Sequence, residues 1–352
     1  MLKAEIDSVL ERSERVLRGE DLPLRDERFK TYAISNFRGG IGKSTLAFNL
    51  AYELSRHYTT LLVDTCPQRN FSQNVFGELI SEFKQTLYDA LIVEITNAGE
   101  CDIADMVTSV KGPCPPFIGR KPTFMIPGSS ELFLFPSLLY SQLAQYAQIA
   151  GGTHTRDASA RVLTALRRVI DEASTTAKPE KVLIDTSPFF GGATHLAWAA
   201  ADALIVPVRV DQHSIEALKL TLDMLKNPGM DFQKFNCQAG LLHHPKVHAI
   251  VMTHCGWNRQ KRNTPDSSTR FFVERAIDVA KEFSDVFSED DLSKCFYLLD
   301  DFYSSGRISG KMRIPLSKLE KGNKYVVDGQ RLEVNPSVDR YQRELANLSV
   351  AL

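Results

Sequence analysis

The sequence predicts an α/β protein in which a mostly parallel, twisted sheet is flanked by helices on both faces. Short apolar runs alternate along the chain with longer segments in which apolar residues recur every three or four positions. Runs that are apolar throughout are typical of parallel strands covered on both sides. The predicted strands span residues 31–36, 60–64, 123–126, 181–185, 203–208, 248–253 and 295–299.

The segments between these strands carry the period of a helix. Leu46, Leu50 and Leu54 share one face of a predicted helix after the first strand, and residues 162–170 and 215–225 show the same spacing. Residues 97–122, with several glycines and prolines, and residues 227–246, with proline and histidine, interrupt the pattern. We expect loops or inserts there, not domain linkers.

Residues 3–18 predict an amphipathic helix that lies outside the main fold, because apolar residues recur at near-helical spacing among charges. A helix of this kind packs on its own domain or on a second copy; the alternative is an arm that binds a partner. The chain is thus expected to comprise an N-terminal helix and linker at 1–29 and one domain at 30–352.

The amino-acid composition limits the classes of protein to which the chain can belong. The chain has 352 residues, and 42 Lys and Arg nearly balance 43 Asp and Glu, so attraction to nucleic acid or a membrane would need a local patch. The six cysteines are scattered without a C-x-x-C pair, which indicates neither zinc nor disulfides and fits a reducing cytoplasm. We expect neither export nor a membrane span, since no apolar run approaches the roughly 20 residues that a span needs.

The stretch SNFRGGIGKST at 35–45 predicts a phosphate-binding loop, although Phe37 stands where the common G-x-x-x-x-G-K-[ST] pattern has glycine. It follows a predicted strand and runs into a predicted helix, so its glycines and the helix N-terminus together form an anion cradle. Lys43 would contact the β- and γ-phosphates, Ser44 would bind Mg²⁺ and Thr45 would contact the α-phosphate. The residues predicted to bind nucleotide are Gly39, Gly40, Ile41, Gly42, Lys43, Ser44 and Thr45.

Two later strands end in aspartate, at Asp64 and at Asp185. Ligands of open parallel sheets gather where strand carboxyl ends meet the loops, which favours both residues as site residues. Asp185 is the expected carboxylate on the Mg²⁺ side.

These motifs resemble the deviant Walker-type ATPases of the ParA/MinD class, and within it the ParA (Soj) partition proteins. The resemblance covers most of residues 30–350 and rests on RGGIGKST, LLVDTCPQRN, TLYDAL at 86–91, FMIPGSSEL at 124–132 and VLIDTSPFFGGATHLAWAAADALIVPV at 182–208. It implies ATP and Mg²⁺ as cofactors and an ATP-dependent homodimer. It further implies nonspecific DNA binding, a ParB-like or other stimulating partner in plasmid or chromosome partition, and a cytoplasmic, nucleoid-associated location.

The chain departs from the family's pattern at two positions. Arg38 replaces a signature lysine that reaches phosphates across the dimer; arginine keeps the charge with a different geometry, although it could also form only a surface salt bridge. Cys66 replaces the second aspartate of D-x-D, which is expected to position the attacking water. Losing such a group typically slows catalysis by about 10²–10⁴. We therefore predict weak hydrolysis, with Asp64 as the residue that could take over.

Two basic segments are candidate DNA contacts. The predicted residues are Arg259, Arg262, Arg270, Lys311 and Arg313. The C-terminal segment 338–352 lacks the aromatic and lysine face of an interfacial anchor, so MinD-like membrane targeting is not expected. Two alternatives to a partition ATPase stay open: an ATP-bound scaffold that does not hydrolyse, and a reductase or synthetase that uses a related loop.

Overall fold

The computed structural model describes residues 2–20, 29–148, 152–258 and 263–352. In this part of the chain, an eight-stranded sheet has the order β3-β4-β2-β5-β1-β6-β7-β8, and its strands are parallel except for β3. The strands are β1 (Thr31–Ile34), β2 (Thr60–Asp64), β3 (Thr108–Ser109), β4 (Thr123–Ile126), β5 (Lys181–Asp185), β6 (Ala203–Arg209), β7 (Lys246–Cys255) and β8 (Phe296–Asp300). A separate antiparallel hairpin joins β9 (Lys324–Val327) and β10 (Gln330–Glu333).

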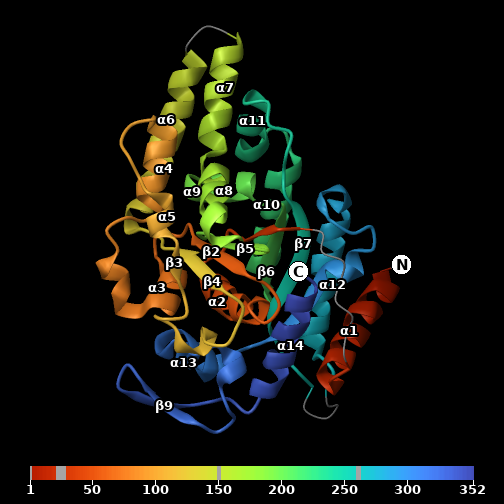
Figure 1. Ribbon diagram of the computed structural model, residues 1–352. Coiled ribbons are helices and arrows are strands. Elements are labelled where there is room, and N and C mark those ends of the chain that lie inside the picture. Colours follow the sequence, from red (N-terminus) through yellow and green to blue (C-terminus); the bar gives the residue numbers. More distant parts are fainter. Residues whose placement is uncertain (1, 21–28, 149–151, 259–262) are drawn as a thin grey trace.

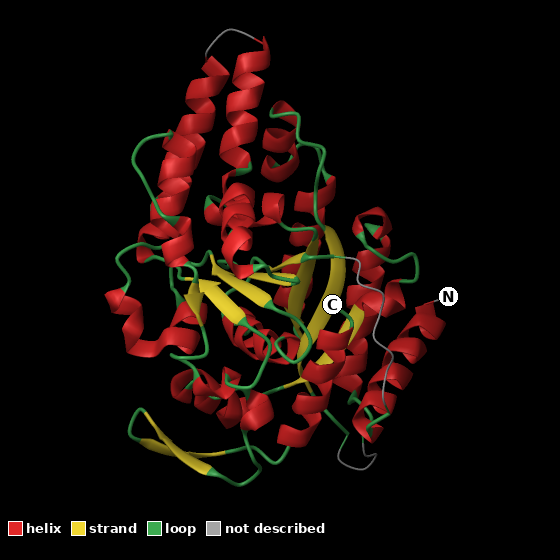
Figure 2. Cartoon of the chain, in the orientation of Figure 1, coloured by secondary structure: helices red, strands yellow, loops and turns green. Residues whose placement is uncertain are grey.

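Helices cover both faces of the sheet, which confirms the predicted fold class (Figures 1 and 2). Alternate residues of β1 belong to different cores: Ala33 faces one cluster, while Tyr32 and Ile34 face the other. The first face packs on α4 (Leu87–Thr96), α8 (Ala165–Ala177), α9 (Ala193–Ala200), α10 (Gln212–Lys226) and α12 (Ser267–Lys281). The second face packs on α2 (Lys43–Leu54), α13 (Tyr303–Met312) and α14 (Val338–Val350).

All seven predicted strands are present, with small shifts at their ends. β1 ends at Ile34 rather than at residue 36, because Ser35 and Asn36 already turn into the phosphate loop. The sequence analysis missed β3 and the β9–β10 hairpin. β3 has only two residues, and the hairpin is largely exposed, so neither produces an apolar run.

The two segments expected to be loops or inserts contain short elements. α5 (Ile103–Met106) and β3 lie in the first, and α11 (Asp231–Gln238) lies in the second. α6 (Phe135–Gln148) and α7 (Gly152–Leu163) pack against each other and project away from the sheet at the top of Figure 1. α3 (Asn70–Phe76) follows β2 at the edge that carries the phosphate loop.

The predicted N-terminal helix is α1 (Leu2–Arg18), and it packs against α12 and α14. Ile6, Val9 and Leu10 are buried in the same core cluster as the first face of the sheet. A salt bridge between Glu5 and Lys281 (2.5 Å) adds a polar contact to α12. The helix therefore lies at the edge of the fold and is joined to it; the domain boundary at residue 29 stays a prediction. None of the described helices is long and apolar enough to cross a membrane.

Candidate functional site

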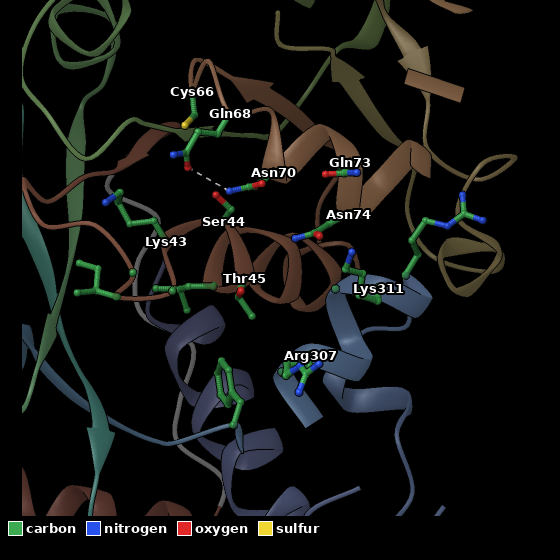
Figure 3. A pocket seen from close by; sticks show the side chains of 18 of the residues that line it. Lys43, Ser44, Thr45, Cys66, Gln68, Asn70, Gln73, Asn74, Arg307 and Lys311 are labelled. Carbon is green, nitrogen blue, oxygen red and sulfur yellow. Dashed lines mark hydrogen bonds between the residues drawn. The ribbon is translucent and has the colours of Figure 1, made fainter. Parts of the chain in front are cut away.

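The phosphate loop connects the end of β1 to the start of α2 and has an open backbone cradle (Figure 3). Gly40 and Gly42 adopt φ angles of 72° and 85°, a left-handed conformation that glycine adopts without strain. Apart from its chain neighbours, no described residue comes within 4 Å of the space that a side chain would enter at either glycine. No side chain caps the N-terminus of α2, so its first N–H groups are available to an anion.

Lys43 folds back onto the loop. Its side chain is 7% exposed, and Nζ donates hydrogen bonds to the carbonyls of Asn36 (3.0 Å) and Arg38 (2.8 Å). Burial lowers the pKa of Lys43 to about 8, while the nearby Asp185 opposes this shift. A phosphate in the cradle would offer the ammonium a charged partner in place of two neutral carbonyls.

Ser44 and Asp185 form a pair beneath the cradle. The Ser44 hydroxyl donates to Oδ2 of Asp185 at 2.6 Å, and the carboxylate is fully buried at the end of β5. Oδ1 of Asp185 has no hydrogen-bond partner among the described residues. Burial and the neighbouring Asp64 raise the pKa of Asp185. A hydroxyl beside a carboxylate with a spare oxygen fits Mg²⁺, which would neutralise phosphate charge there.

Asp64 and Cys66 have different surroundings although both follow β2. The carboxylate of Asp64 is fully buried and accepts bonds from Cys66 N (3.0 Å), Ser72 N (2.8 Å) and Ser72 Oγ (2.7 Å). Asp64 does not line the cavity, whereas Cys66 does. Burial, then the charges of Asp64 and Asp185, raise the pKa of the Cys66 thiol to about 12. The residue that lines the cavity here is therefore a neutral thiol, whereas the hydrogen bonds of Asp64 hold the segment from Cys66 to Ser72.

Arg38 lies outside the cavity. Its guanidinium forms an ion pair with Asp211 and donates to Ser214 Oγ at 2.7 Å. Asp211 is the N-cap of α10 and accepts from the backbone N–H of Ser214 at 3.0 Å. Arg38, at the position of the family's signature lysine, is thus held by Asp211 between β6 and α10 and by Ser214 in the first turn of α10.

Phe37 packs into an aromatic cluster below the loop. Its ring stacks on Trp198 with centroids 5.5 Å apart, and it meets Phe190 edge to face at 6.0 Å. Trp198 Nε1 donates to Ser35 Oγ at 2.9 Å. An aromatic residue at this position therefore anchors the start of the loop to α9, which explains why glycine is not needed there.

A family model described as an AAA domain matches residues 29–229, which is more than half of the chain. The chain therefore belongs to this family, and its motifs resemble those of the ParA-like P-loop ATPases. Curated relatives include the chromosome partitioning protein ParA of Myxococcus xanthus, 26% identical over 227 residues, or 60% of this chain and 66% of the relative. The sporulation initiation inhibitor protein Soj of Bacillus subtilis is 26% identical over 201 residues, covering 56% of this chain and 65% of the relative. The matched segments thus span just under two thirds of the length of both relatives.

The fold of this ParA-like chain is also similar to solved structures. An ATP complex of an McdA variant from Cyanothece superposes with a TM-score of 0.60 at 16% identity, covering 93% of this chain and 98% of that one. At such low identity the likeness concerns the fold. It agrees with the eight-stranded sheet and with the position of the loop at its carboxyl edge.

The cavity of the ParA-like chain extends well beyond the loop, with a volume of about 1310 Å³. Toward the ends of β7 and β8 it is lined by residues that include His254 and Tyr303, whose φ angles of 58° and 44° are unusual for non-glycine residues. Toward α3 and α13 it is lined by amide and basic side chains (Figure 3). These include Gln68, Asn70, Gln73, Asn74, Arg307 and Lys311.

Sequence reasoning missed most of these lining residues. The signal was present on α13, where residues 303, 306, 307, 310 and 311 follow the spacing of one helix face. No local pattern in the sequence indicated that this face of α13 lines the cavity.

Among the basic residues predicted to bind DNA, the three that the structure describes lie in different surroundings. Arg259 and Arg262 lie outside the described residues. Arg270 pairs with Asp7 of α1 at 2.9 Å, and Lys311 pairs with Asp328 at 3.4 Å beside the cavity. Arg313 points inward and donates to the carbonyls of Phe76 and Pro113, both at 3.2 Å. DNA contact through these residues stays a prediction.

Proposed function

We propose that this protein binds ATP with Mg²⁺, forms an ATP-dependent homodimer and hydrolyses ATP slowly or on stimulation by a partner. In this proposal it positions or partitions DNA or another cargo through nonspecific DNA binding. The observation that carries the proposal is the Ser44–Asp185 pair, with its free carboxylate oxygen, beneath an open glycine cradle. Lys43 would bind the phosphates, and Ser44 with Asp185 would hold Mg²⁺.

Exposed apolar side chains beside the site support dimer formation through this face. Phe133 and Leu134 are each 69% exposed, and Phe189 is 40% exposed. The glycines that follow Phe189 pack against Pro136 at the start of α6, so the two exposed groups lie at the same edge of the sheet. Exposed apolar groups of this kind mark association surfaces.

Light scattering after gel filtration tests the dimer. With Mg²⁺ and a non-hydrolysable ATP analogue we expect the mass of two chains, and without nucleotide the mass of one. Phe133→Ser should weaken the dimer, while Leu242→Ser, at an 87% exposed position outside the cavity, should not. A wild-type protein that binds the analogue and stays monomeric would contradict the dimer.

Two relatives are named chromosome partitioning protein ParA, which supports a role in partition, and the proposal adds nonspecific DNA binding and a stimulating, ParB-like partner to that role. In this proposal the protein works in the cytoplasm and is associated with the nucleoid. Retention of duplex DNA by the ATP-bound protein should weaken steeply as salt rises, because phosphate contacts release counterions. Lack of salt-sensitive retention at low salt would remove DNA from the proposal.

A second function is favoured by Cys66. A neutral thiol is a poor acceptor for a water proton, so the ATP-bound form could persist and serve as a scaffold. The two functions differ in turnover. A partition ATPase should hydrolyse ATP faster when DNA and its partner are added, whereas a scaffold should keep its ATP intact under the same conditions.

A further inference from the structure

Arg38 is held at three separate points. Its N–H donates to Asn36 Oδ1 at 2.9 Å, its carbonyl accepts from Lys43 Nζ at 2.8 Å, and its guanidinium pairs with Asp211 and Ser214. Asn36 is itself fixed to the sheet, because its Nδ2 donates to the Pro207 carbonyl of β6 at 2.7 Å. The arginine is therefore fixed in position.

A phosphate in the cradle would affect only one of these three points. Lys43 would exchange the carbonyls of Asn36 and Arg38 for phosphate oxygens, which frees the backbone of residue 38. The hydrogen bond that the Arg38 N–H donates to Asn36 and the ion pair with Asp211 would stay. Nucleotide binding by itself thus leaves the guanidinium on Asp211.

The ion pair with Asp211 is partly shielded from solvent. The two side chains are only 27% and 30% exposed, and Asp211 is already oriented by its N-cap bond to Ser214. Partial burial raises the pKa of Asp211, but hydrogen bonding and the charge of Arg38 outweigh it, and the pKa lies below its ordinary value. Arg209 lies 3.6 Å from the same carboxylate on the other oxygen, so Asp211 is the shared acceptor of two guanidinium groups.

We propose that Asp211 is a positioning residue that holds Arg38 away from the nucleotide and thereby sets how readily Arg38 becomes available to a phosphate group of a second, ATP-bound copy. The inference rests on the proposed dimer. A phosphate on the partner competes with Asp211 for the same guanidinium, so dimer formation has to break this ion pair. Weakening the pair should favour the dimer without changing nucleotide binding by the single chain.

Asp211→Asn isolates the charge, because asparagine caps a helix about as well as aspartate. The matched control is Asp266→Asn, since Asp266 caps α12 through the same kind of bond, to Thr269 N at 2.8 Å, and does not contact Arg38. The first readout is the rate at which phenylglyoxal modifies Arg38 in the monomer, measured by mass spectrometry. Arg18 of α1 serves as internal reference, because its side chain is 61% exposed.

We expect Asp211→Asn to raise the modification rate of Arg38 about fivefold, as for the loss of a partly exposed ion pair, and Asp266→Asn to leave it unchanged. The second readout is the protein concentration at which the ATP analogue produces half dimer. This concentration should fall by a similar factor in Asp211→Asn, and the effect should vanish in an Arg38→Ala background. Analogue affinity at low protein concentration should stay the same.

Equal Arg38 reactivity in wild type and Asp211→Asn would overturn the inference. So would a shift in dimerisation that persists in the Arg38→Ala background, because a structural effect would not depend on the arginine. If the wild type binds the analogue but never dimerises, the proposed dimer fails. In that case the modification rate still decides whether Asp211 holds Arg38.

Discussion

The two ends of the cavity differ in how their polar side chains are held. At the phosphate loop, Lys43 and Asp185 are buried and hydrogen-bonded to neighbouring groups. At the α3–α13 end, the side chain of Lys311 is 61% exposed. It forms an ion pair with Asp328, whose side chain is 57% exposed. A buried, fixed arrangement suits one ligand in one geometry, whereas exposed flexible side chains adapt to many partners. This difference favours the loop end as the place of the proposed nucleotide.

The largest expected effect is at the loop end. Lys43→Ala should lower nucleotide affinity by at least about a hundredfold, because two or more charge-assisted hydrogen bonds to phosphate are lost. Lys311→Ala, at the other end of the same cavity, should change affinity by less than about twofold. Calorimetric titration with the ATP analogue measures both. Equal losses in the two variants would show that the ends do not differ as described.

Stability should depend on pH through the aromatic cluster that supports the loop end. Burial lowers the pKa of His195 to about 4 from 6.5. Below pH 6.5 the unfolded chain therefore takes up a proton that the folded protein does not. The free energy of unfolding should therefore fall by about 1.4 kcal/mol for each unit by which the pH drops from 6.5 toward 4. Above pH 6.5, His195 should not contribute to the pH dependence.

The variant His195→Phe removes this group from the cluster and should flatten the pH dependence. Urea unfolding at pH 7 and pH 5 gives the comparison with wild type. The same loss of stability in both proteins would assign the effect to other groups.

Arg313 fastens the α3–α13 end of the cavity, because it joins the end of α13 to the end of α3 through the Phe76 carbonyl and to the segment after β3 through the Pro113 carbonyl. Arg313→Ala should lower the free energy of unfolding by about 2 kcal/mol, since two hydrogen bonds from a charged donor are lost. Arg331→Ala, on the exposed hairpin, is the surface control and should change it by less than about 0.5 kcal/mol. If Arg313→Ala instead left stability intact and abolished DNA retention, the prediction of a DNA contact would hold.

The smallest effect is expected for DNA. If Lys311 contacts a phosphate, Lys311→Ala should reduce the salt dependence of DNA retention by about one counterion and leave stability nearly unchanged. If the salt dependence of DNA retention is the same in Lys311→Ala and wild type, DNA binds elsewhere on the protein.

Local sequence patterns were sufficient for seven of the eight strands of the sheet and for the position of the glycine-rich loop between a strand and a helix. Seven strands are apolar runs, and the loop is a contiguous motif whose glycines, Lys43 and Ser44 depend on neighbours in the chain. The partner of Arg38 could not be found this way, because Asp211 comes from another strand end that only the folded sheet brings near. The inward direction of Arg313 has the same origin, since charge alone suggested a surface residue.

We propose that this protein binds ATP well and cleaves it slowly because a neutral thiol, Cys66, occupies the position expected to hold an aspartate. The direct test is ATP turnover by wild type, Cys66→Asp and Cys66→Ser, each saturated with ATP and Mg²⁺. We predict that Cys66→Asp is faster than wild type by about a hundredfold or more and that Cys66→Ser is not. A wild-type rate that is already fast and is unchanged in Cys66→Asp would contradict the claim.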